Sequence, residues 1–165
     1  MMQIGEAFVG AGAEAAHLNT VLGTRDGPVG TAWATALATP RAGHTAFVTV
    51  IRPGLAVKPL TLFVNKAALA GEQHSRLTWG AAQAGVAGGV LDAVSSGVID
   101  RAGVDQLVLI AAVWVDPHAA EEELVYRNNR EATSVALAAG RAGAPDLDGL
   151  LEVRDDPANP FFRAG

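Results

Sequence analysis

The four histidines of this 165-residue sequence are the side chains best suited to moving a proton near neutral pH. No two of them have the spacing of metal ligands, and cysteine is absent, so we expect no metal site. His44, His74 and His118 fall in an expected loop or at expected helix starts, where a histidine usually faces solvent. His17 falls inside an expected strand. A structural role is the commoner interpretation there, yet an imidazole can also serve as a general acid.

Two further side chains could contact a ligand. Lys66 ends an apolar segment, where a lysine usually extends its amine to water. Gln83 lies among Ala and Gly residues of an expected helix, either as a cap or as a ligand contact. The phosphate loop and the motifs GxGxxG and GxSxG are absent from the sequence. Nucleotide binding and serine hydrolysis therefore have no support.

The strand that carries His17 is the second of two expected at residues 3–9 and 14–22, joined by a Gly-Ala-Gly turn. Alternation along this strand places His17 and Asn19 on one face and Leu18 and Leu22 on the other. His17 and Asn19 are thus expected to share one surface of a sheet.

Later elements follow from turn signals and hydrophobic patterns. We expect helices over 28–39, 72–96 and 117–139, and strands over 45–51, 61–66 and 106–115. Glycines in the helix over 72–96 indicate that another backbone approaches it closely. The order β-β-α-β-β-α-β-α predicts an α+β domain, with helices on one face of a mixed sheet. We divide the chain into a domain over 1–142 and an irregular tail over 143–165, whose Phe161 and Phe162 dock on the body.

Composition narrows the function classes. Half of the residues are hydrophobic and 18% are charged, which predicts a folded domain. A net charge of −5 with scattered Lys and Arg argues against a nucleic-acid partner. No apolar run approaches the roughly 20 residues of a membrane span, and the N-terminus does not look like a signal peptide, so we expect a cytoplasmic protein without a membrane partner. Spare apolar surface predicts a homo-oligomer.

Many short segments match one family in the same order along the chain. They include IGEA at residues 4–7, AH at 16–17, KP at 58–59, NK at 65–66, AQ at 82–83, GVA at 85–87, DAV at 92–94, EAT at 131–133 and NPF at 159–161. None is specific alone, but together they make chance agreement improbable. On these segments the chain resembles the formaldehyde-activating enzymes, the tetrahydromethanopterin hydro-lyases.

The resemblance implies a fold like that of ribosomal protein S5 domain 2, assembled as a homopentamer with pterin clefts between subunits. It implies that formaldehyde condenses with tetrahydromethanopterin or a related reduced pterin, which is a co-substrate, and that no metal takes part. His17 would be the proton donor. The positions that match the family's pterin contacts are Asn19, Val48, Lys66, Ala68 and Gln83.

The sequence departs from the family pattern beside the proposed acid. Asn19 stands where the family has aspartate, and Ala68 where it has threonine; Ala84 replaces a histidine after the helix glutamine. Asparagine can donate a hydrogen bond where a carboxylate only accepts, and alanine does neither. Two alternatives stay open on this ground: a non-catalytic pterin or one-carbon binding or sensor protein, and a related enzyme that uses tetrahydrofolate or another amine.

Overall fold

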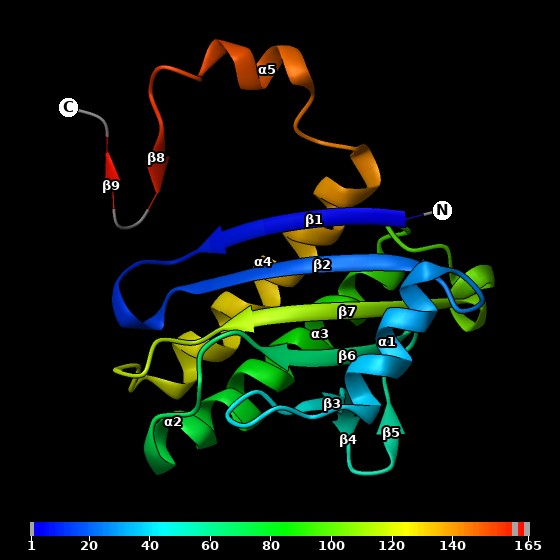
Figure 1. The fold of residues 1–165 in the computed structure, drawn as a ribbon, viewed down its shortest axis with the longest axis vertical. Coiled ribbons are helices and arrows are strands. Elements are labelled where there is room, and N and C mark those ends of the chain that lie inside the picture. Colours follow the sequence, from blue (N-terminus) through cyan, green and yellow to red (C-terminus); the bar gives the residue numbers. More distant parts are fainter. Residues whose placement is uncertain (1, 160–161, 164–165) are drawn as a thin grey trace.

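A five-stranded mixed sheet organises the chain (Figure 1). The computed structural model describes residues 2–159 and 162–163. In spatial order the strands are β1 (Met2–Val9), β2 (Ala16–Thr24), β7 (Leu107–Trp114), β6 (Leu60–Asn65) and β3 (Ala46–Val48). β6 and β7 run parallel and the other neighbours antiparallel, so the sheet is mixed, as the sequence predicts.

Helices lie on both faces of this sheet. α3 (Gln83–Ser95) and α4 (Glu122–Ala142) cover one, which we call the helix face, and α2 (Gly71–Leu77) with the π-helical η2 (Thr78–Ala82) leads into α3. α1 (Pro28–Ala38) crosses part of the opposite, open face (Figure 1). The α+β class is confirmed, and the main elements follow the expected order with shorter elements added. The sequence placed all helices on one face, and α1 differs from that expectation.

Shorter elements complete the described chain. They are η1 (Gly12–Glu14), the hairpin of β4 (Val50–Arg52) and β5 (Leu55–Ala56), η3 (Arg101–Gln106), α5 (Leu147–Glu152), and the two-residue strands β8 (Ala158–Asn159) and β9 (Phe162–Arg163). The strand expected over 45–51 is divided, because β3 pairs with β6 in the main sheet whereas β4 pairs with β5.

The hydrophobic core lies between the helix face of the sheet and the helices α3 and α4 that cover it. Leu18 and Leu22 of β2 are buried in it, whereas His17 and Asn19 on the alternate positions are half-buried on the open face, as predicted. α3 and α4 pack closely because α3 carries glycines: a Cβ at Gly89 would stand 2.5 Å from a backbone oxygen of α4. The close approach that the sequence predicts is confirmed there.

An ion pair between Asp92 and Arg130 joins α3 and α4 at their solvent-exposed side. Nε and Nη2 of Arg130 donate to the two carboxylate oxygens of Asp92, at 2.6 and 2.8 Å. This hydrogen bonding holds the pKa of the Asp92 carboxyl below its usual value. The pair is nearly half exposed, so it adds little to the stability that packing provides.

Two local predictions are wrong. The helix expected to begin at 117 begins at Glu122, because Asp116 accepts a hydrogen bond from the backbone of His118 at 2.8 Å and closes a turn instead. His74 is buried rather than solvated: its Nδ1 accepts from the backbone N–H of Ala70, and its Nε2 donates to the carbonyl of Val115 at 3.0 Å. This imidazole ties the start of α2 to the end of β7.

The chain leaves the body after α4, at Gly143, whose φ of 65° is left-handed. The following residues run past the sheet to α5 and are almost all exposed, including Leu147 and Val153. The side chains of Phe161 and Phe162, which the sequence expects to dock, lie outside the described residues. Within residues 2–159 and 162–163, no helix combines the length and apolar character that crossing a bilayer requires.

Candidate active site

His17 stands at the wall of a hollow on the open face. Its β-sheet neighbours are Phe8 on β1 and Trp114 on β7, each directly in register with it. The rings of Phe8 and His17 lie 5.7 Å apart, tilted against each other. With Lys66 these three residues line a hollow of about 230 Å³. The imidazole is therefore not a core residue, and a ligand can reach it between two aromatic rings.

Glu6 is the nearest charged partner of this imidazole. Its Oε1 lies 3.0 Å from Nε2 of His17, a distance at which the ring N–H donates to the carboxylate. Both side chains remain partly exposed, at 36% for His17 and 58% for Glu6. Nδ1 of His17 has no hydrogen-bond partner in the described part of the chain. Glu6 thus fixes one ring nitrogen and leaves the other for a ligand.

Sequence reasoning missed Glu6, although a signal for it exists. The turn at residues 10–12 joins two strands, and their pairing sets Glu6 opposite Asn19 and Phe8 opposite His17. Glu6 is thus a diagonal neighbour of His17 on the same face, within reach of a long side chain.

Lys66 brings a positive charge to the same hollow. Its backbone N–H donates to the carbonyl of Val113 at 2.7 Å, which continues the β6–β7 pairing by one residue. Its Nζ donates to Oδ1 of Asn19, so the amine lies across β7 and reaches β2. His17, Asn19 and Lys66, three of the residues predicted from the sequence, are brought together.

Ala68 lies in the loop that follows Lys66. The side-chain amide of Asn65 holds this loop, donating to the carbonyls of Gly43 and Ala67 at 2.8 Å each. A Cβ at Gly43 would stand 3.2 Å from the Cβ of Ala68, so the 66–70 and 41–44 segments touch. Ala68 is exposed two residues after Lys66 and offers only a methyl group there.

Val48 and Gln83 lie elsewhere. Val48 is three strands from β2 and four residues along the register from His17, which places it about 20 Å away. Gln83 is nearly buried, and its Oε1 accepts from the backbone N–H of Val50 at 2.7 Å. Within one chain, the predicted residues therefore form two groups: His17, Asn19, Lys66 and Ala68 in one, and Val48 and Gln83 in the other.

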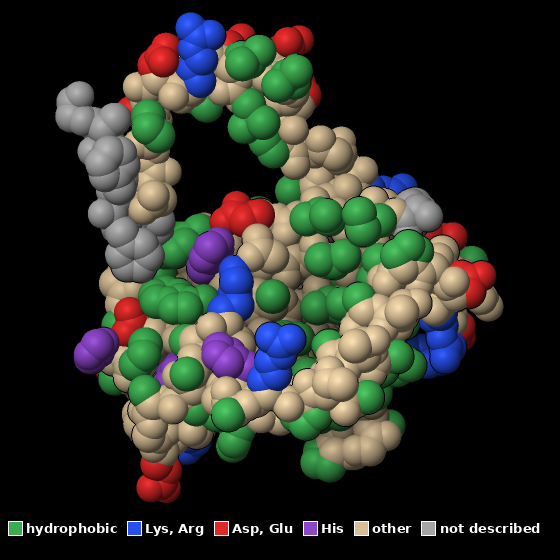
Figure 2. Space-filling view, in the orientation of Figure 1, with side chains coloured by type: hydrophobic (Ala, Val, Ile, Leu, Met, Phe, Trp, Pro, Cys, Tyr) green, Lys and Arg blue, Asp and Glu red, His purple; other side chains and the backbone are tan. Residues whose placement is uncertain are grey.

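The hollow combines a proton carrier, a carboxylate, an ammonium group and aromatic walls. Figure 2 shows histidine, basic and acidic side chains side by side on this face. Aromatic walls suit a flat heterocycle, and an oriented imidazole can give a proton to a leaving oxygen. In the part of the chain that the structure describes, no three His, Asp or Glu side chains come together as they would around a metal ion.

Comparison with known proteins assigns the family. The family model for the formaldehyde-activating enzyme matches residues 4–162. The 5,6,7,8-tetrahydromethanopterin hydro-lyase of Methanosarcina barkeri is 38% identical over 158 residues, which cover 96% of this chain and 89% of that protein. Bifunctional enzymes Fae/Hps of Methanococcoides burtonii and Archaeoglobus fulgidus are 42% and 40% identical over 159 residues, 96% of this chain. The chain spans about 40% of the length of those two bifunctional relatives. On this match, which includes every residue that lines the hollow, the chain belongs to the formaldehyde-activating enzyme family.

Proposed function

We propose that this protein condenses formaldehyde with tetrahydromethanopterin, or a closely related reduced pterin, to give the methylene-bridged pterin and water. It is then a carbon–oxygen hydro-lyase of one-carbon metabolism that also removes formaldehyde. The observation that carries the proposal is the accessible imidazole of His17 beside the hollow, with Glu6 at one ring nitrogen, in a chain of this family. The relative named as a tetrahydromethanopterin hydro-lyase supports the choice of pterin.

The chemistry needs a proton at one oxygen. A ring amine of the pterin adds to formaldehyde and forms a carbinolamine, N–CH2–OH. His17 donates a proton to that hydroxyl as the C–O bond breaks, so water leaves instead of hydroxide. The neighbouring arylamine nitrogen of the pterin side chain then attacks the iminium carbon and loses its own proton, which closes the methylene bridge. One water is formed for each formaldehyde consumed.

The neighbouring side chains have distinct tasks in this scheme. Glu6 holds Nε2 of His17, so Nδ1 is the nitrogen that faces the reacting oxygen. Lys66 and Asn19, already joined to each other, contact polar edges of the pterin, and Phe8 and Trp114 bound its ring faces. Holding both reactants in one geometry supplies much of the acceleration, since the condensation also proceeds without an enzyme. None of these steps needs a metal ion.

The second group of predicted residues belongs in this scheme to a neighbouring subunit. Val48 and Gln83 are too far from His17 to contact the same pterin ring in one chain. A homo-oligomer, a pentamer by resemblance to the family, would bring them to the His17 hollow of the next copy. We place this assembly in the cytoplasm, and we propose that the tail over 143–165 docks on its body.

Replacing His17 with alanine tests the function. At saturating pterin, we expect formation of the methylene product to fall by roughly 10²–10⁴-fold above the uncatalysed background, which is the usual contribution of a general acid. His118→Ala, which removes an exposed imidazole, is the matched control and should keep the wild-type rate. Equal rates for His17→Ala and wild type would remove His17 from the mechanism. If the enzyme forms product from tetrahydrofolate but not from tetrahydromethanopterin, then tetrahydrofolate is its co-substrate and the proposed pterin is wrong.

A further inference from the structure

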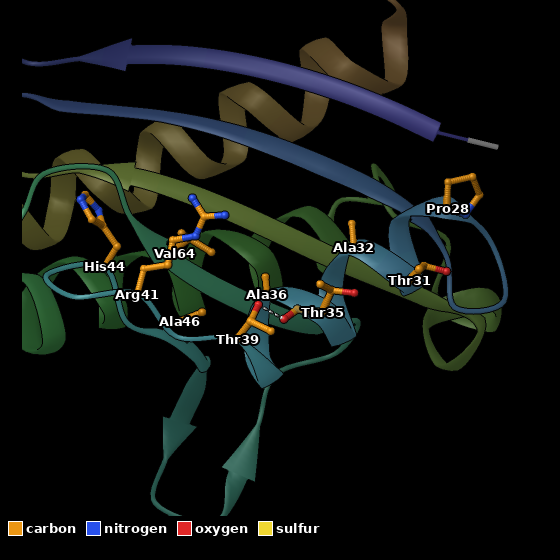
Figure 3. Close-up of a pocket in the computed structure, with 10 residues that line it drawn as sticks. All are labelled: Pro28, Thr31, Ala32, Thr35, Ala36, Thr39, Arg41, His44, Ala46 and Val64. Carbon is orange, nitrogen blue, oxygen red and sulfur yellow. Dashed lines mark hydrogen bonds between the residues drawn. The ribbon is translucent and has the colours of Figure 1, made fainter.

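A second and larger hollow lies on the open face, between α1 and the turn that precedes β3. Its volume is about 540 Å³ (Figure 3). We call it the α1 groove; it is lined by Pro28, Thr31, Ala32, Thr35, Ala36, Thr39, Arg41, His44, Ala46 and Val64. The mechanism above uses none of these residues. The groove is a formed feature of the fold without an assigned task.

The groove is electropositive in an acidic protein. The chain carries a net charge of −5, yet no Asp or Glu among the residues that the structure describes lines the groove. Arg41 has neither an ion-pair partner nor a side-chain hydrogen-bond partner within residues 2–159. In Figure 3, Arg41, His44 and Val64 lie at the same end of the groove, away from Pro28. A guanidinium placed in a hollow without a carboxylate is well suited to a phosphate or carboxylate of a ligand.

The local backbone holds this cation in place. The backbone N–H of His44 donates to the carbonyl of Arg41 at 3.0 Å, and Gly43 takes the positive φ of 75° that this tight turn requires. Nδ1 of His44 donates to the carbonyl of Asn65 at 2.9 Å, and the side chain of Asn65 holds Gly43 in return. The turn that carries Arg41 is thus fastened to the end of β6, one residue from Lys66.

The groove and the His17 hollow are parts of one surface. Val64 of the groove lies on β6 and Lys66 of the hollow follows this strand directly, in a backbone that still pairs with β7, so the two share a face at a spacing of about 7 Å. Val64 is also in register with Ala112, and Ala112 with Asn19, two strand spacings or about 10 Å in all. A ligand held at His17 and longer than one ring system reaches the groove along this row.

We propose that the α1 groove binds the negatively charged extension of the pterin co-substrate, with Arg41 as its anion contact. The inference rests on the proposed function, since it requires the pterin ring to lie at the His17 hollow. The ligand class is a reduced pterin whose side chain carries a phosphate or carboxylate about 10 Å or more from the ring. The groove then selects such pterins over those that end at the ring.

Binding measurements with two pterins test the groove directly. Tetrahydromethanopterin carries a charged extension, and 6-methyltetrahydropterin has the same ring system without one. We expect Arg41→Ala to weaken binding of tetrahydromethanopterin by about tenfold or more, the effect of losing one charge-assisted hydrogen bond, and to leave 6-methyltetrahydropterin unchanged. Arg41→Lys should keep part of the affinity. Arg127→Ala, which removes an exposed arginine from α4 on the other side of the sheet, should bind both pterins as wild type does.

Competition with small anions then shows whether the group that binds Arg41 is a phosphate or a carboxylate. Inorganic phosphate that displaces tetrahydromethanopterin from wild type, but not from Arg41→Ala, identifies a phosphate at Arg41; glutarate behaving in this way identifies a carboxylate. Three results would contradict the proposed role of the groove: Arg41→Ala loses the same affinity for both pterins, Arg41→Ala loses affinity for neither, or neither anion competes with tetrahydromethanopterin. The proposed function is contradicted by a different result. In that case the wild-type protein binds the pterin with this dependence on Arg41 but forms no methylene product.

Discussion

At the scale of the residue, His17 owes its environment to strand pairing and not to its sequence neighbours. Phe8 and Trp114 flank it because β2 pairs with β1 on one side and with β7 on the other. Glu6 reaches it along the diagonal of the first pairing, and Lys66 reaches Asn19 across β7. An exposed imidazole is mobile by itself; these contacts give it one orientation toward the hollow.

Glu6→Gln tests whether that orientation matters. Glutamine keeps the length of the side chain but replaces a charge-assisted hydrogen bond to Nε2 with a weaker neutral one. We expect kcat to fall by about tenfold with little change in KM, because Glu6 holds the acid and does not hold the pterin. The readout is initial rates of methylene-pterin formation across pH, since a positioning partner of the acid alters the pH profile of kcat and a purely structural residue does not.

Two comparisons complete this experiment. Glu131→Gln removes a carboxylate from α4, on the far side of the sheet, and should leave kcat and its pH profile unchanged. Glu6→Asp keeps the charge on a shorter side chain and should recover part of the loss. A wild-type kcat and pH profile in Glu6→Gln would show that His17 works without this carboxylate.

The sequence predicts only part of this site because part of the site is not local. Alternation along β2 suffices to place His17 and Asn19 on one face, and this prediction is confirmed. Trp114 and Lys66 join them through a strand order in which β7 inserts beside β2. No short-range pattern encodes that order. Arg41 and His44 are harder still, because their turn depends on the side chain of Asn65, more than twenty residues away.

At the scale of the element, predicted and observed boundaries agree where local signals act alone. Pro28 starts α1 as expected, and β7 lies within one residue of the strand predicted over 106–115. The helix expected over 72–96 has the right extent but contains the π-helical turn η2. His74 is buried because α2 packs on the end of β7, a tertiary contact that a polar local sequence does not indicate. At His74, tertiary packing therefore overrides the preference of a polar local sequence for solvent.

At the scale of the element, the glycines of α3 also allow α3 to pack closely on α4, and this packing can be tested by substitution. A Cβ at Gly85 or Gly89 would stand 2.5 Å from a backbone oxygen of α4. We expect Gly85→Ala and Gly89→Ala each to lower the free energy of unfolding by about 1–3 kcal/mol or more, because the helices must separate to admit the methyl group. Urea denaturation followed by circular dichroism measures this difference.

Gly80 provides the matched control for these variants. It lies in η2 of the same helical run, and a Cβ there would meet nothing within 4 Å. Gly80→Ala should therefore leave the protein as stable as wild type or slightly more stable, since alanine restricts the unfolded chain. Gly85→Ala and Gly89→Ala variants as stable as Gly80→Ala would mean that the approach of α4 does not require these glycines, because alanine has the higher helix propensity.

At the scale of the whole molecule, the proposed function divides the site residues of one chain into two half-sites. The His17 hollow and the α1 groove lie on the open face, whereas Val48 lies toward the sheet edge and Gln83 beyond it, against β4. Apolar side chains on β1 and in the tail also stay exposed, including Ile4 at 57% and Leu147 at 68%. Surface of this kind is commonly buried between subunits. Both features favour an assembly in which adjacent copies share each site.

Mixing two inactive variants tests the shared site. His17→Ala and Gln83→Ala chains are co-expressed and purified as mixed oligomers, whose composition is verified by native mass spectrometry. If each site takes His17 from one copy and Gln83 from the next, random assembly leaves about a quarter of the sites intact, and activity returns to that fraction of wild type. Co-expression of His17→Ala with Asn19→Ala is the control: both positions belong to the same half-site, so no intact site forms and activity stays absent. Verified mixed oligomers that remain inactive in the first experiment would assign the whole site to a single chain, and Gln83 would then act only through its hydrogen bond to Val50.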